Sequence, residues 1–337
     1  MNAIVMTTIR PPNKVTHQWL EACRKSGWRL IVVGDAKTPE NPWLTLAVEN
    51  RHLCYMTLSD QADEWPELSD WINLNTYARK NFGYLEAILG GAEWIFDTDD
   101  DNAPQAGFTP LDVRLQGAQI RAERVASNGC FNAYSLFGTI GRWPRGYPLD
   151  RLHIVGARTG DEMEVDSPVR QYLCDGDTDV DAIQRLTFSA VPVTFSRCKP
   201  VFGPVLWCPI NSQSCLWHKS AFELLYLPSR CTFRVCDMVR GMIATRRLWM
   251  KGWQVTFHPP AVVQERNEHD TFRDFCDEMP LYGAMWRSFK ELSAVSDGTM
   301  SDCYWTLTRH GLVGTQEYSG VKFWEKAVHD ALCSAGE

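Results

Sequence analysis

Four aspartates within five residues follow a short apolar run in the first third of the chain. The run is Trp94 to Phe96, and the acids are Asp97, Asp99, Asp100 and Asp101. A short apolar run is typical of a buried strand, so the acids lie where that strand leaves the sheet. Carboxylates this close repel one another and raise one another's pKa values, so they favour a nearby cation. Because their oxygens are suitable ligands for Mn²⁺ or Mg²⁺, the segment predicts a metal site that could hold a diphosphate; a solvated acidic turn is the alternative.

Within this segment, Asp99 and Asp101 are predicted to be the metal ligands. Alternate residues of an extended segment point to the same side, so these two carboxylates can face one ion. Asp97 has the same parity and is predicted to orient the site or to contact a ribose. Asp100, between the two ligands, is predicted to contact the molecule that carries the diphosphate. Ligands of open α/β sheets bind beyond the carboxyl ends of the strands, which is where these acids lie.

The composition excludes several classes of protein. A formal net charge of -7 argues against a nucleic-acid-binding protein, which usually presents a basic face. The N-terminus lacks a basic segment followed by a long apolar stretch, and no apolar run is long enough to span a bilayer. The twelve cysteines include no Cys-x-x-Cys pair, so a zinc knuckle is not expected. We therefore expect a cytoplasmic protein, peripheral to a membrane if it is associated with one.

The elements that must position the acids alternate along the first hundred residues. Strands are expected at residues 3–9, 28–33, 53–58 and 95–96, and helices at 15–26 and 77–89. This alternation predicts an α/β fold in which a mainly parallel sheet is flanked by helices. Later in the chain, helices are expected at residues 216–227 and 236–251, a strand at 254–257, and loops around a site at 141–181. We expect a catalytic domain at 1–271, divided into a nucleotide-binding half (1–102) and a sugar- or acceptor-binding half (103–271), and a helical C-terminal extension at 272–337.

Six segments form a recognisable series along the chain: VVGDAKTP (32–39), ARKNFGY (78–84), FDTDDDN (96–102), WPRGYPL (143–149), DTDVDAIQRL (177–186) and FRVCDMVRG (233–241). These segments resemble the STELLO family of glycosyltransferase-like proteins. They are similar, more distantly, to the plant reversibly glycosylated polypeptides, which include UDP-arabinopyranose mutases. Thr178 replaces a proline of the STELLO pattern. The common order of these segments over roughly residues 1–275 argues against chance, and the resemblance implies a GT-A fold, whose Rossmann-like half ends in an Asp-x-Asp (DXD) metal motif.

The resemblance implies further donor-binding residues in the first half. Asp35, after the second strand, is predicted to contact the base or ribose, and Arg10, at the end of the first strand, the nucleotide or its phosphates. Arg79, Lys80 and Asn81 open the helix before the acidic strand. We predict that Arg79 and Asn81 bind the donor and that the basic pair neutralises phosphate or holds the acids. The alternative for Asp35 is a turn residue, and the alternative for Arg10 is a surface arginine. For the segment Arg79 to Asn81 the alternative is an exposed basic turn.

The second half supplies the remaining predicted site residues. Asp237, at the start of a helix, is predicted to be the base that deprotonates an acceptor hydroxyl; an N-cap is the alternative. Arg145 matches the arginine that carries the sugar in reversibly glycosylated polypeptides. Because a guanidinium stays protonated and is a poor nucleophile, we predict that Arg145 binds the sugar or diphosphate. Asp179 and Asp181 are predicted to shape the sugar site, with a helix cap as the alternative for Asp181. His269 is predicted to be a third metal ligand.

Together these features predict a metal-dependent glycosyltransferase of polysaccharide biosynthesis, either a hexosyl- or a pentosyltransferase. Mn²⁺ or Mg²⁺ would stabilise the leaving group of a nucleotide diphosphate sugar, with a UDP-sugar favoured. The sugar would pass with inversion to a hydroxyl of a glycan, a lipid-linked molecule or a protein. Two alternatives stay open. A nucleotide-sugar mutase or self-glycosylating protein would carry a sugar on Arg145, and a non-catalytic GT-A-like scaffold would show no transfer.

Overall fold

The computed structural model describes the chain except for residues 107, 109–116, 154–156, 189–190, 296–297 and 336–337. The strands are β1 (Ala3–Thr7), β2 (Arg29–Val33), β3 (Leu53–Met56), β4 (Trp94–Thr98), β5 (Asn102–Pro104), β6 (Gln119–Ala126), β7 (Arg158–Asp166), β8 (Val169–Gly176), β9 (Val201–Phe202), β10 (Ser214–His218) and β11 (Val255–Gln264). The α-helices are α1 (Lys14–Ser26), α2 (Glu40–Glu49), α3 (Leu58–Glu64), α4 (Pro66–Trp71), α5 (Lys80–Leu89), α6 (Ala133–Leu136), α7 (Ala182–Thr187), α8 (Cys236–Met250), α9 (Thr271–Ala294), α10 (Met300–Thr308) and α11 (Glu317–Ala335). Short 3₁₀ helices are η1 (Tyr77–Arg79), η3 (Leu149–Arg151) and η4 (Lys219–Leu225).

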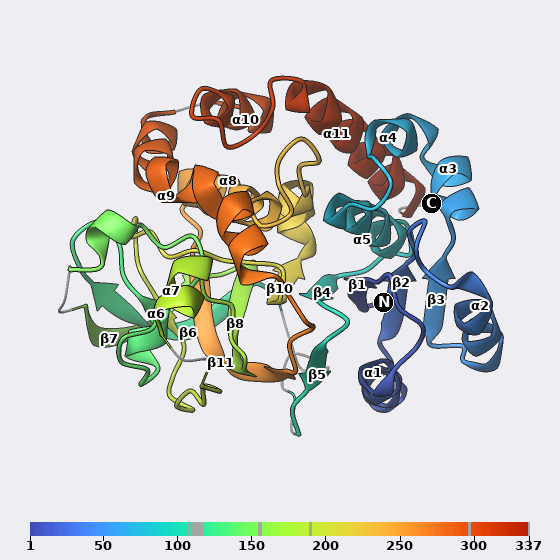
Figure 1. Ribbon diagram of the computed structural model, residues 1–337, viewed down its shortest axis with the longest axis horizontal. Coiled ribbons are helices and arrows are strands. Elements are labelled where there is room, and N and C mark those ends of the chain that lie inside the picture. Colours follow the sequence, from blue (N-terminus) through green and yellow to red (C-terminus); the bar gives the residue numbers. More distant parts are fainter. Residues whose placement is uncertain (107, 109–116, 154–156, 189–190, 296–297, 336–337) are drawn as a thin grey trace.

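One sheet runs through both halves of the molecule. Its order is β3-β2-β1-β4-β10-β8-β11-β9-β6-β7, and β5 pairs with β11 outside this path. The strands β1 to β4 are all parallel. Beyond β4 the sheet is mixed, because β10 is antiparallel to both β4 and β8 whereas β11 is parallel to β8. The predicted α/β class with flanking helices is confirmed (Figure 1).

Side chains that alternate along the first strands bury both faces of the sheet. On one face, Val5 and Val33 pack under α5, where a Cβ on Gly83 would lie 2.6 Å from Val5 and 2.7 Å from Val33. Only glycine allows this close approach of helix and sheet. On the other face, Met6 packs with Trp19 of α1. The strand ends are thereby held in place, and the loops that follow them form one edge of the molecule.

The helix predicted at residues 216–227 is wrong. The structure has the strand β10 here, followed by η4. Cys215, Leu216 and Trp217 are fully buried between β4 and β8, and an apolar run buried on both faces suits a central strand as well as a helix. The strand predicted at residues 254–257 is longer, because β11 continues past a register shift between His258 and Val262.

The C-terminal part of the chain is helical, as predicted. The helices α9, α10 and α11 follow one another around the side of the molecule that carries α8 and α5, and α11 packs on α4 and α5 (Figure 1). Glu317, at the start of α11, accepts hydrogen bonds from the Tyr226 hydroxyl (2.5 Å) and from the backbone N–H groups of Ser229 (3.1 Å) and Arg230 (2.6 Å). Among the described helices, none combines the length and apolar character needed to cross a lipid bilayer.

Candidate active site

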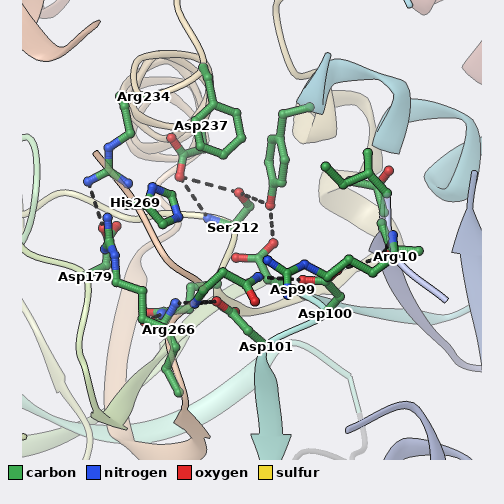
Figure 2. Close-up of a pocket in the computed structure, with 18 of the residues that line it drawn as sticks. Arg10, Asp99, Asp100, Asp101, Asp179, Ser212, Arg234, Asp237, Arg266 and His269 are labelled. Carbon is green, nitrogen blue, oxygen red and sulfur yellow. Dashed lines mark hydrogen bonds and ion pairs between the residues drawn. The ribbon is translucent and has the colours of Figure 1, made fainter. Parts of the chain in front are cut away.

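A cavity of about 420 Å³ lies beyond the carboxyl ends of β1, β2 and β4, where the two halves of the sheet meet. Nine predicted site residues line it: Arg10, Asp35, Asp99, Asp100, Asp101, Arg145, Asp179, Asp237 and His269. Residues that the sequence analysis did not assign to the site also line it, among them Tyr77, Ser212, Phe233, Arg234, Gln264, Arg266 and Asn267. Figure 2 shows the acids Asp99 to Asp101 on one side of this cavity and Asp237, Arg234 and Asp179 on the other.

Asp99 is the first of the three acids that follow β4. Its Oδ1 accepts hydrogen bonds from the Tyr77 hydroxyl (2.5 Å) and from Lys80 Nζ (3.2 Å). Burial raises the pKa of Asp99 to about 7, and the charge of Asp101 adds to the rise, although Lys80 opposes it. A carboxyl group with a pKa near neutrality is under-compensated, so an added cation would stabilise its ionised form.

Asp101 has one satisfied and one unsatisfied oxygen. Its Oδ2 accepts hydrogen bonds from Gln264 Nε2 (3.1 Å) and from the backbone N–H of Asn267 (3.2 Å). Its Oδ1 is buried and has no hydrogen-bond partner among the described residues. Burial raises the pKa of Asp101, against the effect of the Gln264 hydrogen bond. A buried oxygen without a partner is costly, which fits a site for a cation.

The structure does not assemble the predicted set of three metal ligands. Nδ1 of His269 lies 3.4 Å from the Asp274 carboxylate, which engages this ring nitrogen. Within the part of the chain that the structure describes, no group of three or more His, Cys, Asp or Glu side chains is placed to share an ion. Asp99 and Asp101 nevertheless fit a site for Mg²⁺, which proteins often hold through one or two carboxylates, with water and substrate phosphates as the other ligands.

Asp100 connects the acidic turn to its neighbours. Its Oδ2 accepts a hydrogen bond from the Thr8 hydroxyl at the end of β1 (2.5 Å), and its Oδ1 accepts one from Asn267 Nδ2 (3.3 Å). Its backbone carbonyl accepts a hydrogen bond from Asn13, the N-cap of α1 (3.1 Å). Asp100 therefore fixes the turn that carries Asp99 and Asp101, in addition to lining the cavity.

Asp97 does not reach the cavity, and the predicted ribose contact is corrected. It lies within β4, is fully buried, and pairs with Lys80 (2.6 Å) and Arg240 of α8 (2.8 Å). Lys80 is the member of the predicted basic pair that holds the acids, because it contacts both Asp97 and Asp99 and donates to the carbonyl of Thr98 (2.5 Å). Strand parity placed Asp97 beside Asp99, and both carboxylates contact the Lys80 ammonium, but Asp97 is still within β4 and is fully buried, so it does not line the cavity.

Arg79 and Asn81 also lie outside the cavity, so their predicted donor contacts are corrected. Arg79 is buried and donates from Nε to the Gln61 side chain (2.7 Å) and from Nη1 to the carbonyl of Ile72 (3.0 Å). Asn81 exchanges two hydrogen bonds of 2.9 Å with the backbone of Leu227. Arg79 holds the segments that precede η1, and Asn81 joins α5 to a segment 146 residues later, so both side chains have structural roles.

Asp35 lines the cavity and also holds the loop at residues 75–76. Its carboxylate accepts hydrogen bonds from the backbone N–H groups of Ala36 (2.7 Å), Asn75 (2.8 Å) and Thr76 (3.1 Å). Asn75 has a φ of 57°, in the left-handed region that few residues other than glycine adopt. The carboxylate therefore supports a strained turn, and Arg10 extends from the end of β1 along the same wall.

In the second half, Arg145 lies between two carboxylates. Each of its three side-chain nitrogens contacts a carboxylate: Nε contacts Asp179 (3.0 Å), and Nη1 and Nη2 contact Asp237 (2.9 and 2.8 Å). Nη1 also donates to the carbonyl of Arg234. Burial would lower the pKa of Arg145, but Asp179 and Asp237 hold it well above its ordinary value. The guanidinium is a permanently charged clamp that aligns both carboxylates.

Asp237 is linked to the acidic turn by a chain of hydrogen bonds. Its Oδ2 lies 3.4 Å from both the backbone N–H and the hydroxyl of Ser212. The Ser212 hydroxyl lies 2.8 Å from the Tyr77 hydroxyl, which in turn contacts Asp99 (Figure 2). Sequence reasoning missed Tyr77, which lies in η1, and Ser212, because a lone hydroxyl gives no signal. Asp237 lies inside the first turn of α8, whose N-cap is Val235, so the predicted N-cap alternative does not apply.

Asp179 and Asp181 have different surroundings, although only one residue separates them. Burial would raise the pKa of Asp179, but Arg145 and Arg234 outweigh it and hold this pKa below its ordinary value. Asp181 lies outside the cavity and caps α7, accepting from the backbone N–H of Gln184 (2.8 Å) and from Trp143 Nε1 (2.5 Å). Its predicted sugar contact is corrected in favour of the helix cap.

Arg234 and Arg266 also line the cavity, and each is paired with acids. Arg234 pairs with Glu278 of α9 (2.7 Å), and Arg266 pairs with Asp274 (2.8 Å). Burial and the nearby positive charges of Arg185 and Arg234 lower the pKa of Arg266 to about 10. A guanidinium crowded by other cations favours an anion beside it. Arg234 belongs to a motif quoted above, whereas Arg266 had no recognisable signal.

Comparison with known proteins supports the resemblance that the motifs predicted. No family model matches the chain. Over 288 residues, or 80% of this chain, it is 30% identical to probable glycosyltransferase STELLO2 of Arabidopsis thaliana and 28% identical to STELLO1 of the same plant. The aligned part is 36% of each relative, so the chain spans about a third of the length of the curated relatives it matches. Among solved structures, it is similar to the glucosyl-3-phosphoglycerate synthase of M. tuberculosis, with a TM-score of 0.41 and 10% identity over 88% of this chain and 82% of that chain.

Proposed function

From its likeness to the STELLO proteins, we propose that this chain is a GT-A glycosyltransferase that transfers a sugar from a nucleotide diphosphate sugar to an acceptor hydroxyl. Both curated relatives are named as probable glycosyltransferases. The observation that carries the proposal is the shared cavity. Under-compensated carboxylates, Asp99 and Asp101, face it from one wall, and a carboxylate aligned by Arg145, Asp237, faces it from the other. The first wall would bind the charged donor, and the second wall would supply the base.

Asp99 and Asp101 would hold a divalent cation, Mn²⁺ or Mg²⁺, together with the donor diphosphate. When bound, that cation would offset the negative charge that develops on the departing nucleotide diphosphate. Lys80 holds Asp99 in place, and Arg266 supplies positive charge to the cavity near Asp101. We propose that the nucleotide lies along the wall formed by Arg10, Asp35 and the turn at residues 75–76, with a UDP-sugar as the favoured donor.

Asp237 would act as the base. The acceptor oxygen attacks the anomeric carbon, the bond from that carbon to the diphosphate oxygen breaks, and the acceptor proton passes to an oxygen of Asp237. A single displacement of this kind inverts the anomeric centre. Arg145 positions Asp237 and does not touch the reacting atoms. The division into a catalytic domain at 1–271 and an extension at 272–337 is part of the same proposal.

Arg145 also bears on the self-glycosylating alternative. A sugar on this arginine would require a free, deprotonated guanidinium nitrogen. All three nitrogens contact carboxylates, and the pKa of Arg145 is held above its ordinary value by Asp179 and Asp237, against the effect of burial. These contacts disfavour a covalent role and support the positioning role.

The proposal can be tested by thermal unfolding with UDP-glucose, UDP-galactose, UDP-arabinopyranose and GDP-mannose, each with and without Mn²⁺. A ligand that binds only the native state raises the melting temperature. We expect a shift that needs both Mn²⁺ and one nucleotide sugar, and that is lost in an Asp99→Asn, Asp101→Asn double variant. Asp161→Asn, an exposed acid on β7, is the matched control. If no nucleotide sugar shifts the wild type, or if none is then hydrolysed or transferred, the scaffold alternative replaces the enzyme.

A further inference from the structure

Phe233 is an exposed aromatic residue in a cavity lined mainly by charged and polar side chains. Its side chain is 51% exposed, and it belongs to neither buried core cluster of the described residues. A large apolar side chain that the core does not use, placed among charges, indicates a surface that a ligand covers. The sequence analysis quoted Phe233 as part of a motif but gave it no role.

The ring has one aromatic neighbour, and the residues before and after Phe233 are anchored to α9. It packs edge to face against Tyr77, with the ring centroids 5.4 Å apart and the planes at 89°. On one side of it in sequence, the Thr232 hydroxyl donates to the carbonyl of Asp277 (2.6 Å). On the other side, Arg234 pairs with Glu278 (2.7 Å). A ring fixed in this way loses little freedom when a ligand stacks on it.

The position of the ring indicates which ligand it serves. Phe233 lies three residues before the start of the helix that carries Asp237, and both residues line the cavity. The nucleotide wall is formed by other segments, around Asp35 and Asn75. An aromatic face carries partial negative charge, and the C–H bonds on the less polar face of a pyranose carry partial positive charge, so the two attract each other.

We propose that Phe233 is the stacking platform of an acceptor subsite that takes a carbohydrate ring. The proposal rests on the proposed function and narrows its acceptor to a sugar. A sugar stacked on Phe233 places its hydroxyl groups at the edge of the ring, within the cavity that holds the Asp237 carboxylate. The platform sets which acceptor is bound, and Asp237 acts on the hydroxyl that is presented.

The test is ligand-observed saturation-transfer NMR with the full chain and the methyl glycosides of glucose, galactose, mannose and xylose, each with and without UDP and Mn²⁺. In the wild type we expect at least one glycoside to receive saturation. Phe233→Ala should weaken its binding about tenfold, whereas Phe233→Trp should keep it. Phe272→Ala is the matched control, because Phe272 is 71% exposed but does not line the cavity. Calorimetric titration of UDP should give the same affinity in all variants, and their melting temperatures should stay close to that of the wild type.

Three results would overturn the inference: no glycoside binding to the wild type, equal binding to wild type and Phe233→Ala, or a loss in Phe233→Ala of UDP affinity with glycoside affinity unchanged. Failure of the proposed function has a different signature. In that case UDP and the nucleotide sugars do not bind any variant, while glycoside binding in their absence still depends on Phe233.

Discussion

The two carboxylate clusters that face the cavity differ in how their charge is compensated. At the end of β4, Asp99 has Lys80 as its cationic partner among the described residues, and burial raises its pKa to about 7. On the opposite wall, Arg145 and Arg234 overcome the effect of burial and keep the pKa of Asp179 low. The first cluster lacks positive charge, and the second cluster has enough.

This difference in charge compensation indicates which cluster binds a ligand and which cluster only holds its side chains in position. A buried carboxylate that is short of partners is ready for a ligand that brings positive charge, because the ligand removes a cost already present in the protein. A carboxylate saturated by arginine has a fixed orientation and little need for further charge. The comparison therefore assigns ligand capture to the turn after β4 and orientation to the cluster around Arg145.

The largest effect on stability is expected at Arg145, which compensates the charge of the second cluster. Arg145→Met would leave Asp179 and Asp237 buried without the guanidinium between them, and removal of one partner of a buried ion pair costs about 3–5 kcal/mol. Urea denaturation followed by circular dichroism would measure the loss. Arg121→Met, which removes an exposed pair with Glu162, is the control and should change nothing measurable. A loss no larger than that of the control would mean that Arg145 is not a framework residue.

The pH dependence of stability tests the under-compensated cluster. The folded-state pKa of Asp99 is raised from 3.8 to about 7 by burial, so the native state binds more protons between these values. Stability should therefore fall as pH rises from about 4 to 7, by on the order of 2–4 kcal/mol in the presence of EDTA. Asp99→Asn should make this fall shallower, because the raised pKa values of Asp101 and Asp181 also contribute to it, and Mn²⁺ should offset the Asp99 part in the wild type alone. Urea titrations of both proteins at several pH values would measure the free energy of unfolding as a function of pH. The same pH dependence in the wild type and in Asp99→Asn would contradict the prediction.

Tyr77 tests whether the two clusters act together. Tyr77→Phe removes the hydroxyl that contacts both Asp99 and Ser212, and a hydrogen bond to a charged group contributes about 1.5–3 kcal/mol. We also expect the coupling between Asp99→Asn and Asp237→Asn, measured by a double-mutant cycle of stability, to fall toward zero in the Tyr77→Phe background. Coupling that is unchanged without the hydroxyl would show that the hydrogen-bond chain does not join the clusters.

The smallest effect is expected at Asp181, which lies near Asp179 but outside the cavity. Asp181→Ala removes the cap of α7 and should cost about 1 kcal/mol. The affinity for UDP, measured by calorimetry, should not change. A clear loss of UDP affinity would restore the ligand-binding role that the structure replaces with a cap.

The sequence predicted what depends on neighbouring residues. The acids after β4 could be recognised because an apolar strand and its carboxyl end are adjacent in the chain, and the α/β class followed from the alternation of short segments. Parity did not show that Asp97, still within β4, is fully buried and does not line the cavity. The alternation of residues also did not reveal that both faces of β4 are covered. An acid within this strand must therefore pair with buried cations, here Lys80 and Arg240.

The remaining features of the site depend on residues that are far apart in the chain. Arg145 lies 34 residues from Asp179 and 92 residues from Asp237, and no local pattern announces that the three side chains meet. Arg79 and Asn81 were assigned to the donor because basic and amide groups suit phosphate. The fold instead uses them to hold the carbonyl of Ile72 and the backbone of Leu227, which lie in separate segments. Such partners become visible only when the topology is known.

The pairing of β4 restricts how a substrate can enter. This strand is hydrogen-bonded to β1 on one side and to β10 on the other, and β10 continues the ladder to β8. An unbroken ladder of this kind does not bend like a hinge, so the two halves cannot open and close as a pair of jaws. Molecules must therefore enter and leave over the rim of the cavity, which residues 75–77 and 266–269 line in part. The scattering profile in solution should accordingly stay the same when the protein is saturated with a nucleotide.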